Sequence, residues 1–231
     1  MASNFGKTIQ VATFGASHGY AIGGIVEGLP CGHTIDIDEL QAFLKRRAPG
    51  QNQLQTQRKE ADIPEFLSGM VDGMLSGSPL AFMIRNTSQH SGDYNNLRDI
   101  PRPSHADFTA RMRYGDKVDM RGGGHFSARL TAPLWVAGGI ALQLLREKGI
   151  EIHGHLKQVG SIQDVPIDMV HPDMQALAHI ATKPIAMVDA NKRTEVENLV
   201  MQLKKDGDST GGIVEVIATG FPVGFVNPKF V

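Results

Sequence analysis

The chain has 231 residues, 41% of them hydrophobic and 20% charged, with a formal net charge of −1. This composition is typical of a globular protein and excludes a disordered or fibrous chain, and the length suits one large domain or two small ones. Because the net charge is close to zero, no overall positive field attracts nucleic acid or anionic lipid, and any anion binding must be local.

Cysteine content and the first residues predict a cytoplasmic protein. The single cysteine, Cys31, excludes an internal disulfide framework and suits a reducing compartment, where we expect it to pack as a small apolar side chain. The opening MASNFGKTIQVATFG lacks the basic patch and apolar segment of a signal peptide. No apolar run approaches the roughly 20 residues that a membrane-spanning helix needs, so no membrane role is expected.

The first half of the chain predicts short strands and one helix. The helix is expected over Asp36–Arg47, where Asp36 or Asp38 caps its start and Pro49 stops it. The loop GASHGYAIG separates the first two strands. Alternation and β-branched residues predict strands over the segments Lys7–Phe14, Gly24–Val26, Glu65–Gly69 and Leu80–Arg85.

The second half begins with Thr87–Ala106, a long polar segment for which no regular element is predicted and whose length is typical of functional or disordered loops. Thr131–Lys148 is apolar nearly all round, which predicts a buried core helix ending at Gly149. No repeat or linker divides the chain, so a single domain over residues 1–231 is expected. The remaining predictions are strands over Ile150–Ile162 and Gly212–Ala218, and helices over Pro172–Ile180 and Asn191–Lys205.

The stretch RGGGHFSARL, residues 121–130, leaves two interpretations open. Its glycines, Gly122–Gly124, allow positive φ and close backbone approach. Ser127 can cap the following helix, whose N-terminal amides favour an anion, and Arg129 adds a bidentate donor. The alternative is a glycine-rich hairpin followed by an ordinary helix cap. The stretch matches neither a P-loop nor a dinucleotide-binding spacing.

Two histidines are candidates for acid–base chemistry. His105 lies in RPSHADFT, between Pro103 and Asp107, where a nearby carboxylate could support it; the alternative is a surface loop histidine. His18 lies in GASHG at the end of the first strand, among small residues that we expect to leave its ring uncrowded. A G-x-S-x-G pattern is absent around Ser17, so a serine hydrolase is not expected.

A group of basic residues at the end of the first predicted helix and in the following loop forms either a solvated face or the positive wall of an anion site. The remaining histidines lack metal-ligand spacing, so no metal is predicted, although His153 and His155 share a strand face. The basic residues concerned are Lys45, Arg46, Arg47, Arg58 and Lys59.

Taken in order, the motifs FGASHGYAIGGIVEGLP, RRAPGQ, TQRKEAD, RNTSQHSGDY, RPSHADFT, RGGGHFSARLTAP and KKDGDSTGG resemble the chorismate synthase family over essentially the whole chain. The resemblance implies an α+β sandwich with a helical layer between sheets. It also implies the final shikimate-pathway step, in which 5-enolpyruvylshikimate 3-phosphate loses phosphate and a C6 proton in an anti 1,4-elimination that yields chorismate. Reduced FMN is required without net oxidation, NADPH is a candidate reductant, and a cytoplasmic homotetramer is expected.

The same resemblance implies roles for particular residues. His18 matches the histidine proposed to protonate the departing phosphate, and His105 the one proposed to protonate the reduced flavin. The segment His125, Phe126 and Ser127 matches the one that contacts FMN, through backbone groups and the serine side chain.

Arginines are expected to bind the negative groups of substrate and cofactor, because guanidinium groups suit carboxylates and phosphates. Arg47 matches an arginine of a nucleotide or substrate site, Arg129 a substrate-binding arginine, and Arg46 is a further candidate. Two positions depart from the family pattern: Ala16 replaces the usual glutamate beside the histidine, and Gln53 replaces a basic residue.

Length is the largest departure, because the family continues well beyond Val231. The closing GFPVGFVNPKFV predicts a chain cut before its next element, with further FMN-binding residues absent. A truncated, non-catalytic homologue is therefore the alternative function. A generic phosphate-ligand or RNA-binding module is disfavoured by the neutral charge and the few aromatic residues.

Overall fold

The computed structural model describes residues 3–48, 61–87 and 100–224, and these form two compact units. The first unit is built from the described residues up to Leu144, and the second from the described residues from Leu145 onward. The sequence predicted a single domain over residues 1–231, and this stays a prediction; the two units are described separately below.

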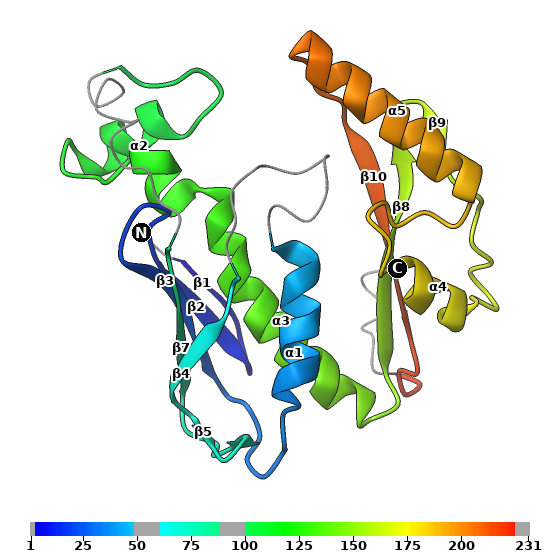
Figure 1. Ribbon diagram of the computed structural model, residues 1–231. Helices are drawn as coiled ribbons and strands as arrows, with labels where there is room; N and C mark the ends of the chain where they lie inside the picture. Colours follow the sequence, from blue (N-terminus) through cyan, green and yellow to red (C-terminus); the bar gives the residue numbers. More distant parts are fainter. Residues whose placement is uncertain (1–2, 49–60, 88–99, 225–231) are drawn as a thin grey trace. The chain divides into compact units, whose positions relative to one another are not determined.

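An antiparallel five-stranded sheet forms the first unit, in the order β1-β2-β3-β7-β4 (Figure 1). In β7 the residues alternate between buried and less buried positions, which is the period of a sheet with one face covered. A small hairpin, β5–β6, follows β4. The bounds are β1 Asn4–Gly6, β2 Gln10–Gly15, β3 Ala21–Glu27, β4 Pro64–Ser68, β5 Met70–Val71, β6 Met74–Leu75 and β7 Leu80–Arg85.

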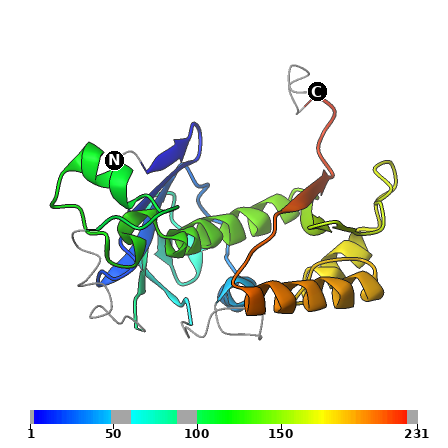
Figure 2. The ribbon, with the colours of Figure 1, turned by 90° about the horizontal axis from the view of Figure 1, so that it is seen from above.

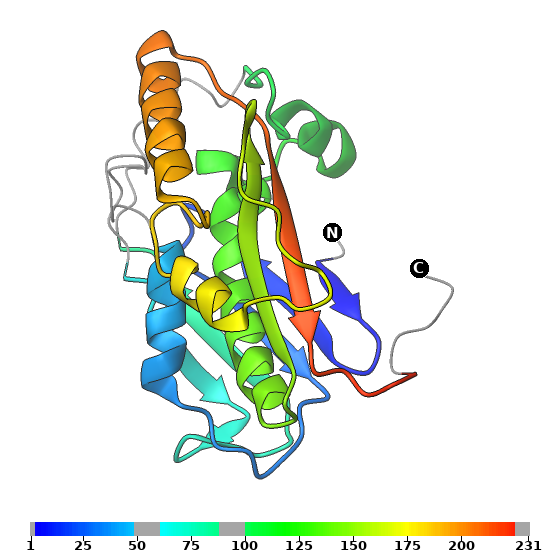
Figure 3. The ribbon, with the colours of Figure 1, turned by 90° about the vertical axis from the view of Figure 1, so that its right-hand side faces the viewer.

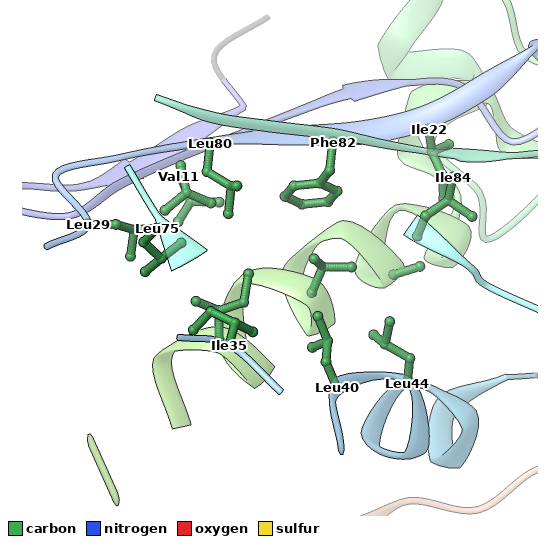
Figure 4. Close-up of a cluster of buried hydrophobic side chains, with 14 of the residues drawn as sticks. Val11, Ile22, Leu29, Ile35, Leu40, Leu44, Leu75, Leu80, Phe82 and Ile84 are labelled. Carbon is green, nitrogen blue, oxygen red and sulfur yellow. The ribbon is translucent and has the colours of Figure 1, made fainter. Parts of the chain in front are cut away.

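Two helices, α1 (Ile37–Arg47) and α3 (Thr131–Arg146), cover one face of this sheet (Figure 1). Leu40 and Leu44 of α1, one turn apart, point toward the sheet side chains Phe82 and Ile84 (Figure 4). These four side chains are at most 1% exposed, and burying each stabilises the fold by about 1.5–3 kcal/mol.

Close contact between the two helices depends on Gly139 of α3. A Cβ at this position would lie 2.5 Å from Cδ1 of Leu40, so a larger residue would force the helices apart. Around this contact, Phe43 stacks on Trp135 with ring centroids 4.7 Å apart. The glycine and the aromatic pair are thus where α1 and α3 pack closely together.

The short elements that precede α3 are a helix, α2 (Asp107–Tyr114), and two 3₁₀ turns, η2 (Arg121–Phe126) and η3 (Ala128–Leu130). No helix was predicted from the sequence at α2. By length and composition alone, the stretch Arg121–Arg146 is apolar enough to cross a membrane, although the sequence predicted no such run. Half of its apolar window is buried within the protein, and Val136 and Ile140 have no exposed surface, as expected of a core helix.

The second unit is a three-stranded antiparallel sheet with two helices on one face (Figure 2 and Figure 3). Ile217 of the sheet packs against one helix, and Val196 of the other helix joins Met187 in a separate apolar cluster. Asp189 caps the second helix by accepting from two backbone amides, and Gly207 ends it with a φ of 66°. The bounds are β8 Glu151–Val159, β9 Ile162–Gln163, β10 Gly212–Thr219, α4 Met174–Ile180 and α5 Ala190–Asp206.

The predicted elements are present with shifted ends, except that the single strand predicted over Ile150–Ile162 is two strands, β8 and β9, which a turn joins into a hairpin. Leu80–Arg85 is confirmed as a strand, and of the two caps proposed for the first helix the structure uses Asp36, whose carboxylate accepts from the backbone N–H of Glu39 at 2.8 Å. The first predicted strand is shorter than expected and starts at Gln10, because residues 7–9 turn between β1 and β2.

Candidate active site

The His18 imidazole packs against the glycine turn of η2. His18 lies between β2 and β3 and is only 8% exposed. A Cβ on Gly122 would lie 2.0 Å from Nδ1 and Cε1 of this ring, so only glycine leaves room for it. The backbone N–H of Ser17 donates to the carbonyl of Gly124 at 3.0 Å, which ties the histidine loop to the turn. The prediction of an uncrowded His18 is therefore wrong.

The three glycines lie in the 3₁₀ turn η2 and not between two strands, so the hairpin interpretation is wrong. Gly122, Gly123 and Gly124 have φ values of 58°, 85° and 55°. Ser127 does cap the following turn, because its Oγ accepts from the backbone N–H of Arg129 at 3.2 Å. Anion binding at this turn stays a prediction.

A carboxylate lies within electrostatic reach of His18 although position 16 is an alanine. The hydrogen bond from Arg121 lowers the pKa of Asp119, and the charge of His18 adds a smaller lowering. The Asp119–Arg121 pair measures 2.8 Å between Oδ2 and Nη2. Asp119 thus provides negative charge near the imidazole, where Ala16 provides none.

The side chain of His125 joins β2 to the glycine turn. Its Nδ1 lies 2.8 Å from the carbonyl of Gly15, and its Nε2 lies 2.6 Å from Oγ of Ser3. Because a carbonyl can only accept, Nδ1 carries a proton and donates it. The ring borders a depression of about 600 Å³ lined by Ser3, Asn4, Ala12, Thr13, Phe14, Gly15 and His125.

Phe126, the residue after His125, forms an aromatic pair with Tyr114. Phe126 is 41% exposed and stacks on Tyr114, with ring centroids 6.2 Å apart and planes inclined by 30°. An exposed aromatic face of this kind favours contact with a flat heterocyclic ring. The pair therefore fits a planar cofactor such as a flavin.

Two of the predicted arginines share one buried carboxylate. Asp62, 2% exposed, accepts from Nη1 of Arg47 at 2.7 Å and from Nη1 of Arg129 through its other oxygen. Arg47 also donates to Oγ1 of Thr131 at 3.1 Å and to the carbonyl of Ala128 at 3.3 Å. Buried charges require such pairing, and the Asp62 carboxylate serves both guanidinium groups at once.

Asn86 links this cluster to the His18 loop. Its Oδ1 accepts from Nε of Arg129 at 3.3 Å, and its Nδ2 donates to the carbonyls of Ala16 at 3.1 Å and Gly19 at 2.8 Å. Sequence reasoning named neither Asp62 nor Asn86. Both belong to motifs that carry the family resemblance, Asp62 to TQRKEAD and Asn86 to RNTSQHSGDY. Their membership in these motifs was the signal from which they could have been identified.

His105 is exposed and lies in the loop before α2. Its Nδ1 is 2.9 Å from the carbonyl of Pro103. Asp107, expected to support it, instead accepts from Nε and Nη2 of Arg102 at 2.7 and 2.9 Å. That hydrogen bond is the main reason that the pKa of Asp107 is lowered, and the charge of His105 contributes least.

Arg46 lies over the ring of Phe43, with Cζ 5.4 Å from the ring centroid, and so contacts the aromatic stack. Its neighbour Arg47 instead pairs with Asp62. Arg58, Lys59 and Gln53 lie outside the described residues.

Comparison with known proteins identifies the family. The family model for chorismate synthase matches residues 9–230. The chorismate synthase of Ralstonia pickettii is 44% identical over 229 residues, covering 99% of this chain and 60% of that protein. That of Lancefieldella parvula is 41% identical over 241 residues, covering 100% of this chain and 63% of that protein.

A crystal structure of a chorismate synthase superposes with a TM-score of 0.73 at 25% identity, covering 94% of this chain and 59% of that one. The α+β fold class predicted from the sequence is confirmed by this likeness. The chain spans about three fifths of the length of the curated relatives it matches. With the matched family model and the motifs in order, the chain belongs to the chorismate synthase family.

Proposed function

We propose that this protein catalyses the 1,4-elimination of phosphate from 5-enolpyruvylshikimate 3-phosphate to give chorismate, a carbon–oxygen lyase reaction. The observation that carries the proposal is the chain of contacts from Arg47 and Arg129, through Asp62 and Asn86, to the loop of His18. It supports a site where fixed cations and an imidazole act on one anionic substrate.

The arginines bind and orient the substrate. The substrate carries two carboxylates and a phosphate, and guanidinium groups suit such anions because they donate paired, charge-assisted hydrogen bonds. Arg47 and Arg129 hold these groups, and Arg46 stays a further candidate at the end of α1. Because Asp62 already holds both guanidinium groups in place, little reorganisation is needed when the charge on the leaving phosphate grows.

His18 and His105 handle protons. As the bond between C3 and the phosphate oxygen breaks, His18 donates a proton to the departing phosphate. The electrons of the C6–H bond form a double bond between C1 and C6, the ring double bond moves from C1–C2 to C2–C3, and the C6 proton is transferred to a base. His18 suits this role because Gly122 and the loop contacts hold its ring in one orientation. The exposed His105 holds or supplies a proton at the cofactor.

Reduced FMN fits the residues around the glycine turn. Phe126, which stacks on the half-buried Tyr114, offers an exposed aromatic face for a flat ring, while the backbone of His125 and the hydroxyl of Ser127 offer polar contacts. When bound, reduced FMN supplies electron density to the substrate ring without net oxidation. NADPH is the proposed reductant. A cytoplasmic homotetramer without a metal, and with no membrane or nucleic-acid partner, completes the proposal.

The test is an anaerobic assay of the purified protein with reduced FMN and 5-enolpyruvylshikimate 3-phosphate, measuring both chorismate and phosphate. Stoichiometric release of the two products is expected. His18→Ala should lower turnover by roughly 10²–10⁴, the usual scale for lost acid–base catalysis, and His105→Ala should do the same. Substrate binding without turnover by the parent protein would refute catalysis and support the non-catalytic homologue.

A further inference from the structure

We infer that Asp62 is a positioning residue of the elimination site, which holds Arg47 and Arg129 in register and, through Asn86, aligns them with the His18 loop. This inference rests on the proposed function. In the proposed function, Asp62 contacts neither the substrate nor the cofactor, and it acts through the two arginines.

The first support is the degree of burial of the three charged groups. The side chains of Asp62, Arg129 and Arg47 are 1%, 5% and 16% exposed. Each carboxylate oxygen serves a different arginine, Oδ2 for Arg47 and Oδ1 for Arg129. The width of a single carboxylate therefore sets the distance between the two guanidinium groups.

The second support is the backbone of Asp62. Its φ of 49° lies in the left-handed region, which residues other than glycine rarely adopt. Aspartate adopts this region more readily than most residues, as Asp72 with a φ of 48° also does, so the conformation is a turn that orients the side chain. Asp62 comes just before β4, and this backbone conformation accompanies a carboxylate turned to both arginines and away from solvent.

The third support is the use of every polar group on Asn86. Its single oxygen accepts from Arg129, and its amide nitrogen donates to two carbonyls, one on either side of His18 in the chain. A displacement of Arg129 would therefore change the hydrogen bonds that hold the His18 loop. The arginines bind the anion and the imidazole protonates it, so their relative position decides whether bound substrate reacts.

Asp62→Asn is the informative substitution, because it keeps the shape of the side chain and removes its charge. The cluster then gains one positive charge, so inorganic phosphate should bind as tightly as in the parent protein or more tightly. Both arginines lose their ion pair with Asp62 and are no longer aligned with each other by it, so kcat for 5-enolpyruvylshikimate 3-phosphate should fall roughly 10²-fold. A purely structural role would not separate phosphate binding from kcat in this way.

A readout that needs no turnover is the reactivity of each arginine toward phenylglyoxal, mapped by mass spectrometry. In Asp62→Asn, Arg47 and Arg129 should react several-fold faster than in the parent. Arg85 and Arg102, which pair with Glu65 and Asp107, are internal references and should keep their rates. Glu65→Gln is the matched control, because it removes a carboxylate from an exposed arginine pair of the same sheet and should leave kcat, Arg47 and Arg129 unchanged.

Three results would overturn the inference: parent-like kcat in Asp62→Asn, unchanged reactivity of Arg47 and Arg129, or a rise that includes Arg102, which would indicate general loosening. If the parent protein itself shows no turnover, the proposed function fails for it. Arginine reactivity and the calorimetric affinity for inorganic phosphate then still decide whether Asp62 positions the two arginines.

Discussion

Gly122 offers a sharp test of the site, because its missing side chain is what makes room for the His18 ring. In Gly122→Ala the new Cβ would lie 2.0 Å from Nδ1 and Cε1 of the imidazole, far inside van der Waals contact. The φ of 58° adds a left-handed penalty of about 1–2 kcal/mol for alanine. Relieving the overlap by moving the ring adds about 1–3 kcal/mol. The free energy of unfolding should therefore fall by about 2–5 kcal/mol.

Gly123→Ala is the matched control for this substitution. Its φ of 85° carries the same kind of backbone penalty, but its Cβ would meet only the Cβ of Ser127, at an ordinary 3.5 Å. The difference between the two variants in urea unfolding thus isolates the contact with His18, about 1–3 kcal/mol. Turnover of Gly122→Ala should fall by roughly 10²–10⁴, toward that of His18→Ala, because the displaced imidazole no longer reaches the phosphate.

A double variant completes the cycle. His18→Ala empties the space that the new methyl group needs, so adding Gly122→Ala to it should destabilise no more than Gly123→Ala does. If Gly122→Ala were as stable and as active as Gly123→Ala, or if His18→Ala failed to relieve it, the ring would not lie over Gly122 and the reasoning would be refuted.

Two further predictions concern charged pairs. The pKa of Asp107 is lowered mainly by its hydrogen bond from Arg102, so its carboxyl binds protons less readily folded than unfolded; this contribution to stability is present above about pH 4 and is lost as the pH falls below it. Urea unfolding from pH 6 downward should show a shallower loss in Asp107→Asn than in the parent, and an equal slope would contradict the pairing. Arg47→Lys keeps one charge facing Asp62 but loses the donors to Thr131 and Ala128; the KM for substrate should rise roughly tenfold or more, since a charge-assisted hydrogen bond contributes about 1.5–3 kcal/mol, and an unchanged KM would remove Arg47 from the substrate site.

Local patterns in the sequence predicted most elements of the fold. The alternation of Leu80–Arg85 indicated a strand with one covered face, and the apolar run after Ser127 indicated a core helix; both are present. Asp36 was predicted as a cap because capping depends on residues only a few positions apart. The helix Asp107–Tyr114 was missed, since it is eight residues long and has no side-chain cap to mark its start.

For the candidate site, the sequence by itself determined the family and, through that resemblance, predicted roles for His18, Arg47 and Arg129. Only the tertiary structure decided how they are held: Asp62 reaches Arg129 across 67 positions in the chain, and His125 reaches Gly15 across 110. It also reversed the expectation for His18. The small residues beside it in the chain suggested an uncrowded ring, but in the folded protein the ring packs directly against the backbone of Gly122. The physical reason is that periodicity, capping and turn chemistry act between residues close in the chain, whereas pairing of buried charges depends on which distant segments the sheet and helices bring together.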